Sequence, residues 1–171
     1  MKKILFVFAL LLAACNTSQS TIVVPMYSAD TSSYIGKVIF SDTAKGLRIQ
    51  TDLTNLPFGE HGFHVHEYPN CNIGTNKKHQ IESALAAGGH YDPEKTGKHL
   101  GPNGGGHKGD LPRLIVLKNG RTQQVFYLAS IKTVDFVNKS LMIHAGGDNY
   151  KDTPLPLGGG GKRIACGIIE K

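Results

Sequence analysis

The histidines of this chain are spaced in a pattern that can hold two metal ions side by side. Six of the eight histidines and one aspartate form the pattern: His64, His66, His90, His99, His107, Asp110 and His144. Three imidazoles and a carboxylate make a tetrahedral zinc site with no open position. A site built only from imidazole nitrogens suits copper. A closed site beside a redox-capable site is a more specific signal than any one motif in the chain.

Two of these histidines belong to a short extended segment. His64 and His66 are two residues apart within 62–67, so in a strand both side chains lie on one face and Val65 points to the core side. A single His-x-His pair is weak evidence, because histidines are common on exposed strand faces. The four further histidines of the pattern favour metal ligands over solvated surface residues.

The rest of the chain contains short segments rich in Val, Ile and Thr with turn residues between them, which predicts an all-β sandwich or barrel. We expect eight strands, at 21–27, 33–40, 47–53, 62–67, 114–117, 124–129, 141–144 and 163–169. Residues 84–87 could form one turn of helix. Two long stretches, 68–113 and 145–162, have no strand pattern, and loops this long usually have a function. They contain or border most of the candidate ligands.

The N-terminus predicts export. Residues 1–14 are typical of a signal peptide, because Lys2 and Lys3 precede an apolar stretch that is too short to span a bilayer. Leu12-Ala13-Ala14-Cys15 resembles a bacterial lipoprotein signal, in which the cysteine is lipidated; the alternative is an ordinary secretory signal cleaved near Ala14. Either one places the protein in the periplasm or cell envelope. Residues 15–20 read as a polar tether and 21–171 as one domain.

The cysteine count agrees with export. If Cys15 is lipidated, Cys71 and Cys166 remain as a pair in an oxidising compartment, where they should form a disulfide. On the chain-entropy model a loop of this length is worth roughly 4–5 kcal/mol, as an upper estimate. Two unrelated buried thiols are the alternative.

The net charge of the chain indicates which classes of molecule it could bind. The formal net charge is +6, and removal of Lys2 and Lys3 leaves 6 − 2 = +4. The basic residues are scattered without an arginine-rich run or interleaved aromatics, which disfavours nucleic-acid binding. A mildly basic surface suits a small anionic substrate.

Several motifs together resemble the copper,zinc superoxide dismutase family, and most closely its bacterial periplasmic branch. The resemblance covers the chain from about Thr21 to the C-terminus and is carried by Gly62-Phe63-His64-Val65-His66, Gly88-Gly89-His90-Tyr91-Asp92-Pro93, Gly97-Lys98-His99-Leu100-Gly101-Pro102, Gly109-Asp110-Leu111, Met142-Ile143-His144-Ala145-Gly146-Gly147-Asp148 and Gly161-Lys162-Arg163-Ile164-Ala165-Cys166-Gly167. The fold it implies is an eight-stranded Greek-key β-barrel or sandwich with two long functional loops.

The resemblance also implies a role for each candidate residue. His64, His66 and His144 resemble terminal copper ligands, and His90 the histidine that bridges copper to zinc. His99, His107 and Asp110 resemble the other zinc ligands. Asp148 resembles an aspartate that orients one ligand of each metal, and Arg163 an arginine that holds an anion beside copper. Ordinary turn and surface residues are the alternatives for these last two. His61 and His79 match no ligand position and are expected on the surface.

The activity implied is the conversion of superoxide to dioxygen and hydrogen peroxide by copper redox cycling, with His90 carrying a proton, in protection of the cell envelope. The expected cofactors are one copper and one zinc per chain. A homodimer is compatible with the resemblance, and membrane association would come only through a lipid on Cys15. Two alternative functions are a copper/zinc carrier and a zinc hydrolase. Arg163 argues against the carrier, which would not need an arginine that holds an anion, and the closed zinc site argues against the hydrolase, which would need an open zinc position and a nearby general base.

Overall fold

The computed structural model describes residues 20–171. The expected signal peptide, the lipidation site Cys15 and most of the polar tether lie outside the described residues. Within them the all-β prediction is confirmed: strands dominate, and the helices are single 3₁₀ turns. None of these helices has the length and hydropathy needed to cross a bilayer.

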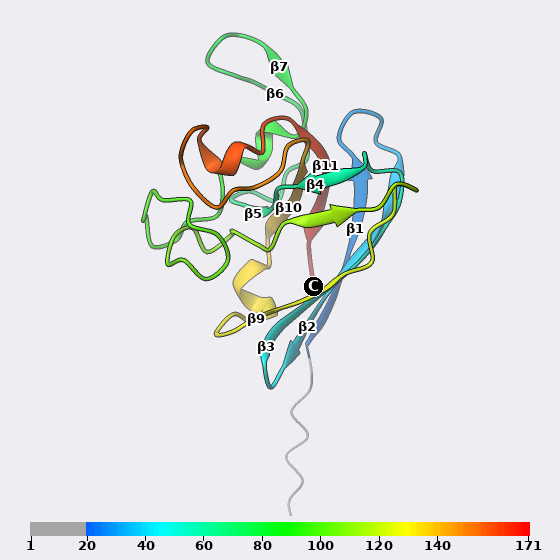
Figure 1. Cartoon of the computed structure of the whole chain (residues 1–171), viewed down its shortest axis with the longest axis vertical. Coiled ribbons are helices and arrows are strands. Elements are labelled where there is room, and N and C mark those ends of the chain that lie inside the picture. The colour runs from blue at the N-terminus through cyan, green and yellow to red at the C-terminus, as the bar shows by residue number, and fades with distance from the viewer. Residues whose placement is uncertain (1–19) are drawn as a thin grey trace, which may run out of the picture.

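Seven strands form one curled antiparallel sheet (Figure 1). Their order across the sheet is β5 (Phe63–His66), β10 (Lys139–His144), β11 (Arg163–Ile169), β1 (Thr21–Ser28), β2 (Tyr34–Thr43), β3 (Gly46–Leu53) and β9 (Val125–Leu128). The last strand therefore pairs with the first, at Tyr27↔Cys166 and Ser28↔Ala165. After β3 the chain crosses to the opposite edge of the sheet, where it forms β5. It returns to pair with β3 only at β9.

Four short strands lie outside this sheet. The ribbon of β4 (Gly59–His61) and β8 (Leu114–Val116) is one pair, and the hairpin of β6 (Gly74–Thr75) and β7 (Ile81–Glu82) is the other. The hairpin stands out from the body of the molecule (Figure 1). The eight predicted strands are all present, but eleven are found in residues 20–171, because β4, β6 and β7 are too short to show a pattern.

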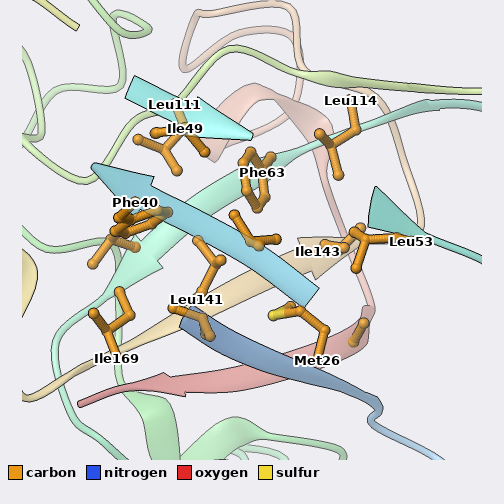
Figure 2. Packing of buried hydrophobic residues seen from close by; sticks show 14 of the residues in the cluster. Met26, Phe40, Ile49, Leu53, Phe63, Leu111, Leu114, Leu141, Ile143 and Ile169 are labelled. Carbon is orange, nitrogen blue, oxygen red and sulfur yellow. The ribbon is translucent and has the colours of Figure 1, made fainter. Parts of the chain in front are cut away.

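The core forms against the concave face of the sheet. In β1 the side chains of Ile22, Val24 and Met26 are buried while their neighbours are exposed, which is the alternation expected of a strand with one solvated face. Figure 2 shows how the aromatic rings of Phe40 and Phe63 and aliphatic side chains from different strands meet there. Burial of such side chains is worth about 1.5–3 kcal/mol each, so this core is a rigid support for the loops.

Two long connections carry the remaining structure. Residues 67–113 contain the β6–β7 hairpin and the 3₁₀ turn η1 (Leu85–Ala87), which matches the predicted helical turn. Residues 145–162 contain η3 (Leu157–Gly159), and η2 (Thr133–Phe136) lies between β9 and β10. The first connection is tied to β11 by the predicted disulfide between Cys71 and Cys166, whose Cα atoms are 5.8 Å apart and 95 residues apart in sequence.

Candidate metal centre

Strands β5 and β10 form the rigid base of the site. In β5 the residues alternate as expected: Phe63 and Val65 belong to the core, and His64 and His66 lie on the opposite face. Cross-strand pairs place Met142 opposite His64 and Ser140 opposite His66. His144 is the last residue of β10, so it reaches the same region from the neighbouring strand.

The first long loop is joined to the free edge of β5 by backbone hydrogen bonds. Tyr91 N–H donates to Val65 O at 2.8 Å, and Val65 N–H donates to Gly109 O at 2.9 Å. Single bridges also pair His66 with His90 and His64 with Asp110. This pairing brings two ligand candidates that are distant in sequence alongside the strand.

One compact group of ligand atoms contains only imidazoles. His64, His66, His90 and His144 each offer a nitrogen, and these atoms lie within 4.8 Å of one another. The Nε2 atoms of His66 and His144 are 3.3 Å apart. Their Nδ1 atoms are taken up by backbone carbonyls, with His66 donating to Gly88 O at 2.9 Å and His144 donating to Gly161 O at 3.0 Å. These bonds fix the tautomers that leave Nε2 free for a metal.

A second group forms around Asp110. Its Oδ1 lies 3.0 Å from His90 Nδ1 and 3.4 Å from His107 Nδ1, and its Oδ2 lies 3.0 Å from His99 Nδ1. The compact group of four found here is His64, His90, His99 and Asp110, with His107 beside Asp110. His64 and His90 occur in both groups. Of the two, His90 has a ring nitrogen for each side, with Nδ1 toward Asp110 and Nε2 left for the all-imidazole side.

Asp148 is hydrogen-bonded to one histidine of each group. Its carboxylate accepts a hydrogen bond from His64 Nε2 at 2.8 Å and another from His99 Nε2 at 2.7 Å. The buried carboxylate also accepts from Tyr150 N–H at 2.8 Å, which fixes its orientation. One acid thus sets the tautomer of a histidine in each group, so that Nδ1 faces inward in both.

The buried Nδ1 atoms of His64, His99 and His107 have no hydrogen-bond partner among the described residues. Buried polar atoms without partners are rare in folded proteins and require an explanation. Three such atoms around one carboxylate and one shared imidazole fit metal ligands, since a metal is the partner that an unprotonated ring nitrogen can bind. The donor set of nitrogens and one carboxylate suits zinc and copper.

Burial keeps the imidazole-only side neutral. Burial lowers the pKa of His90 to about 4 and that of His144 to about 3, and repulsion between each of these rings and His64, were both protonated, adds to both shifts. Burial likewise lowers the pKa of His66 well below its ordinary range. Neutral rings are the form that binds a metal.

The side that contains Asp110 has the opposite electrostatics. Burial favours the neutral ring of His99, but the neighbouring carboxylates of Asp110 and Asp148 outweigh this and raise its pKa to about 9. Burial also opposes ionisation of both aspartates, yet the histidine hydrogen bonds hold their pKa values below the ordinary range. A positive charge is therefore favoured here, which is what a divalent cation would supply.

Arg163 begins β11 and turns its guanidinium toward the first loop. Nη1 donates to Ala84 O at 2.6 Å and Nη2 donates to Gly88 O at 2.5 Å. Gly88 O is also the acceptor of His66 Nδ1–H, so one carbonyl orients both the arginine and a ligand candidate. Gly88 has a φ of +79°, and a Cβ there would meet Glu67 Oε2 at 2.6 Å, so glycine is required at this position.

A pocket of about 720 Å³ opens over the site. His66, His90, His144, Lys162 and Arg163 line it, and Ile81, Leu85 and Leu157 are among the apolar residues around them. His99 and Asp110 are buried and do not line it. Three imidazoles of the first group, although buried, therefore border the pocket beside two cations and Glu82, whereas the group around Asp110 is closed.

The prediction for His61 is wrong, whereas His79 is exposed as expected. The side chain of His61 is 2% exposed, with Nδ1 2.7 Å from His144 O and Nε2 2.8 Å from Pro57 O. It thus supports the backbone of a ligand candidate from the core side. The alternation of Phe63 and Val65, extended back by two residues, would have placed His61 inside.

The fold and the site define an all-β protein with two adjoining clusters suited to metal ions, one closed and one bordering a pocket that contains Arg163 and Lys162. A family model described as copper/zinc superoxide dismutase (SODC) matches residues 34–169. A Brucella abortus protein named superoxide dismutase [Cu-Zn] is 44% identical over 99% of this chain and 100% of its own length.

Solved structures of copper/zinc superoxide dismutases resemble this fold closely. The Cu/Zn superoxide dismutase from Brucella abortus has a TM-score of 0.84 at 46% identity, and covers 88% of this chain and 100% of its own. The monomeric copper, zinc superoxide dismutase from Salmonella enterica has a TM-score of 0.76 at 45% identity, with the same coverages. The chain belongs to the copper/zinc superoxide dismutase family, an oxidoreductase family that uses copper and zinc.

Proposed function

We propose that this chain converts two superoxide ions and two protons to dioxygen and hydrogen peroxide at the pocket beside Arg163. In this proposal the copper ligands are His64, His66, His90 and His144, and the zinc ligands are His90, His99, His107 and Asp110. His107 completes the zinc set because its unpartnered Nδ1 lies beside Asp110.

The observation that carries the proposal is the difference in access between the two groups. His66, His90 and His144 of the imidazole-only group line the pocket together with Arg163, whereas His99 and Asp110 are buried and do not line it. A reaction that needs contact between substrate and metal can therefore take place only on the open side. The closed side suits a structural zinc site.

Copper held by His64, His66, His90 and His144 would supply the redox couple, which takes up one electron from a first superoxide and returns it to a second. The side chains of Arg163, His90 and Asp148 bind the substrate, hold a proton and orient the ligands. The Arg163 guanidinium binds and orients the anion, with its two Nη atoms held by the carbonyls of Ala84 and Gly88. His90 Nε2 holds a proton for the outgoing peroxide, while its Nδ1 stays on the zinc side. Asp148 keeps His64 and His99 in the tautomers that present Nδ1.

Metal analysis combined with a superoxide assay tests the proposal. We expect one copper and one zinc per chain after reconstitution, and superoxide consumption that requires copper. Binding of both metals without superoxide consumption would indicate a metal carrier. One zinc with no affinity for copper would refute the assignment of both sites.

We also propose that the chain is exported and anchored to the envelope through a lipid on Cys15. The Leu12-Ala13-Ala14-Cys15 run supports the anchor, and the Cys71–Cys166 disulfide supports an oxidising compartment. The intact mass of the protein from cells should show an acylated chain that begins at Cys15; an unmodified chain cleaved near Ala14 would refute the anchor. The homodimer stays a prediction, which sedimentation velocity on the chain without lipid would test.

A further inference from the structure

A second cation lies beside Arg163 at the pocket. Lys162 lines the pocket, and its side chain is 60% exposed. Its backbone is fixed, since Ala145 N–H donates to Lys162 O at 2.7 Å. Lys162 is therefore placed to attract the same anion that Arg163 would hold.

An acid from the opposite end of the sequence meets this lysine. Asp30 belongs to the turn after β1, and its Oδ2 lies 2.8 Å from Lys162 Nζ across a separation of 132 residues. The turn is anchored to β11, because Ala29 N–H donates to Ile164 O at 2.9 Å. Ser83 Oγ–H donates to the other carboxylate oxygen at 2.7 Å, so Asp30 is held from two sides.

We propose that Asp30 limits the attraction of the pocket for anions by pairing with Lys162, and thereby sets the rate at which the substrate anion enters. The inference rests on the proposed function and adds a residue that acts on substrate entry without touching the reacting atoms. Asp30 is a positioning residue in this sense, because it acts through Lys162. A paired lysine and aspartate contribute little net potential in the pocket, whereas an unpaired Lys162 contributes a full positive charge.

The size of the effect follows from Coulomb's law. A unit charge that acts through water over about 10 Å changes the energy of a univalent anion enough to alter its local concentration about twofold. Salt screens such an interaction, with a Debye length of about 30 Å at 0.01 M and about 8 Å at 0.15 M ionic strength. The effect should thus be large at low salt and small at physiological salt, which a purely structural role would not produce.

Four variants test this in the metal-loaded protein: Asp30→Asn, Lys162→Gln, the double variant, and Asp52→Asn as a matched control. Asp52 is a partly exposed acid on β3 that lies 3.9 Å from Arg121, and it does not line the pocket. Its substitution changes the net charge by the same amount as Asp30→Asn. The readouts are kcat/KM for superoxide and the Kd of azide, each measured from low to high ionic strength at equal metal content.

At low salt we expect Asp30→Asn to raise kcat/KM about twofold, to tighten azide binding similarly and to steepen the salt dependence. Lys162→Gln should lower kcat/KM, and the double variant should return close to the original protein. A rate for Asp30→Asn equal to that of Asp52→Asn, or lower than that of the original protein, would overturn the inference. Absence of superoxide consumption in the unsubstituted protein would instead refute the proposed function.

Discussion

Replacing Arg163 with Ile should leave both metals and the fold in place but slow superoxide turnover by roughly tenfold. The guanidinium is half-buried and its hydrogen bonds go to neutral carbonyls, so its charge is not cancelled by a contacting acid. A unit charge about 4 Å from an anion is worth about 1 kcal/mol in water and about 4 kcal/mol at a dielectric constant near 20. For a partly exposed site we take about 1–2 kcal/mol, and about 1.4 kcal/mol is tenfold in rate.

The assay is direct decay of superoxide at several ionic strengths, with metal content measured on the same samples. Arg163→Ile should show a weaker salt dependence, since part of the attraction that salt screens has been removed. Arg163→Lys is the matched control, because the charge survives while the planar fork that donates to Ala84 and Gly88 is lost. It should keep more activity than the Ile variant.

Full activity and an unchanged salt dependence in Arg163→Ile would refute the reasoning and move the anion-holding role to the other cation of the pocket, Lys162. Loss of copper from the variant would also count against it. That outcome would mean that Arg163 acts by holding Gly88, the carbonyl that it shares with His66.

Three further outcomes are expected. Asp110→Asn should weaken zinc binding far more than copper binding, because a neutral amide is a poorer ligand; equal loss of both metals in a chelator competition would contradict the two assignments. Cys166→Ser should lower the free energy of unfolding by about 2–5 kcal/mol in urea titrations, since it removes the bridge to Cys71, and an unchanged value would argue that the bridge is not stabilising. The metal-free protein should lose stability as the pH falls from about 6.5 toward about 4, because the pKa values of His90 and His144 are lowered to about 4 and about 3, and the unfolded chain binds their protons more readily. A urea midpoint that is constant over that range would contradict this.

The sheet was predictable because its long strands repeat a simple alternation. Every strand of the seven-stranded sheet matches a predicted segment to within a few residues. The three missed strands, β4, β6 and β7, have two or three residues each, so neither periodicity nor composition can reveal them. The β6–β7 hairpin is largely exposed, and it is held by its turn and by the Asn76 side chain, which bonds Gln80 and Glu82, rather than by a core.

The candidate ligands were predictable from residue type and motif, but their supports were not. Arg163 and His66 both donate to Gly88 O. Every residue has a backbone carbonyl, so the sequence does not reveal which carbonyl a side chain will bind. The contact between Asp30 and Lys162 joins residues from opposite ends of the chain, which only the pairing of β1 with β11 brings together. His61 was misplaced because it was considered alone and not as part of the strand alternation.

The disulfide has a consequence for the order in which the protein matures. Cys71 opens the loop that supplies the carbonyls of Ala84 and Gly88, and Cys166 follows Arg163 by three residues on β11. A newly made chain with free thiols has every proposed metal ligand but lacks the covalent bond that joins the strand of Arg163 to the loop of its acceptors. We therefore expect acquisition of metal and competence in turnover to be separable events, the second of which requires oxidation of the two thiols.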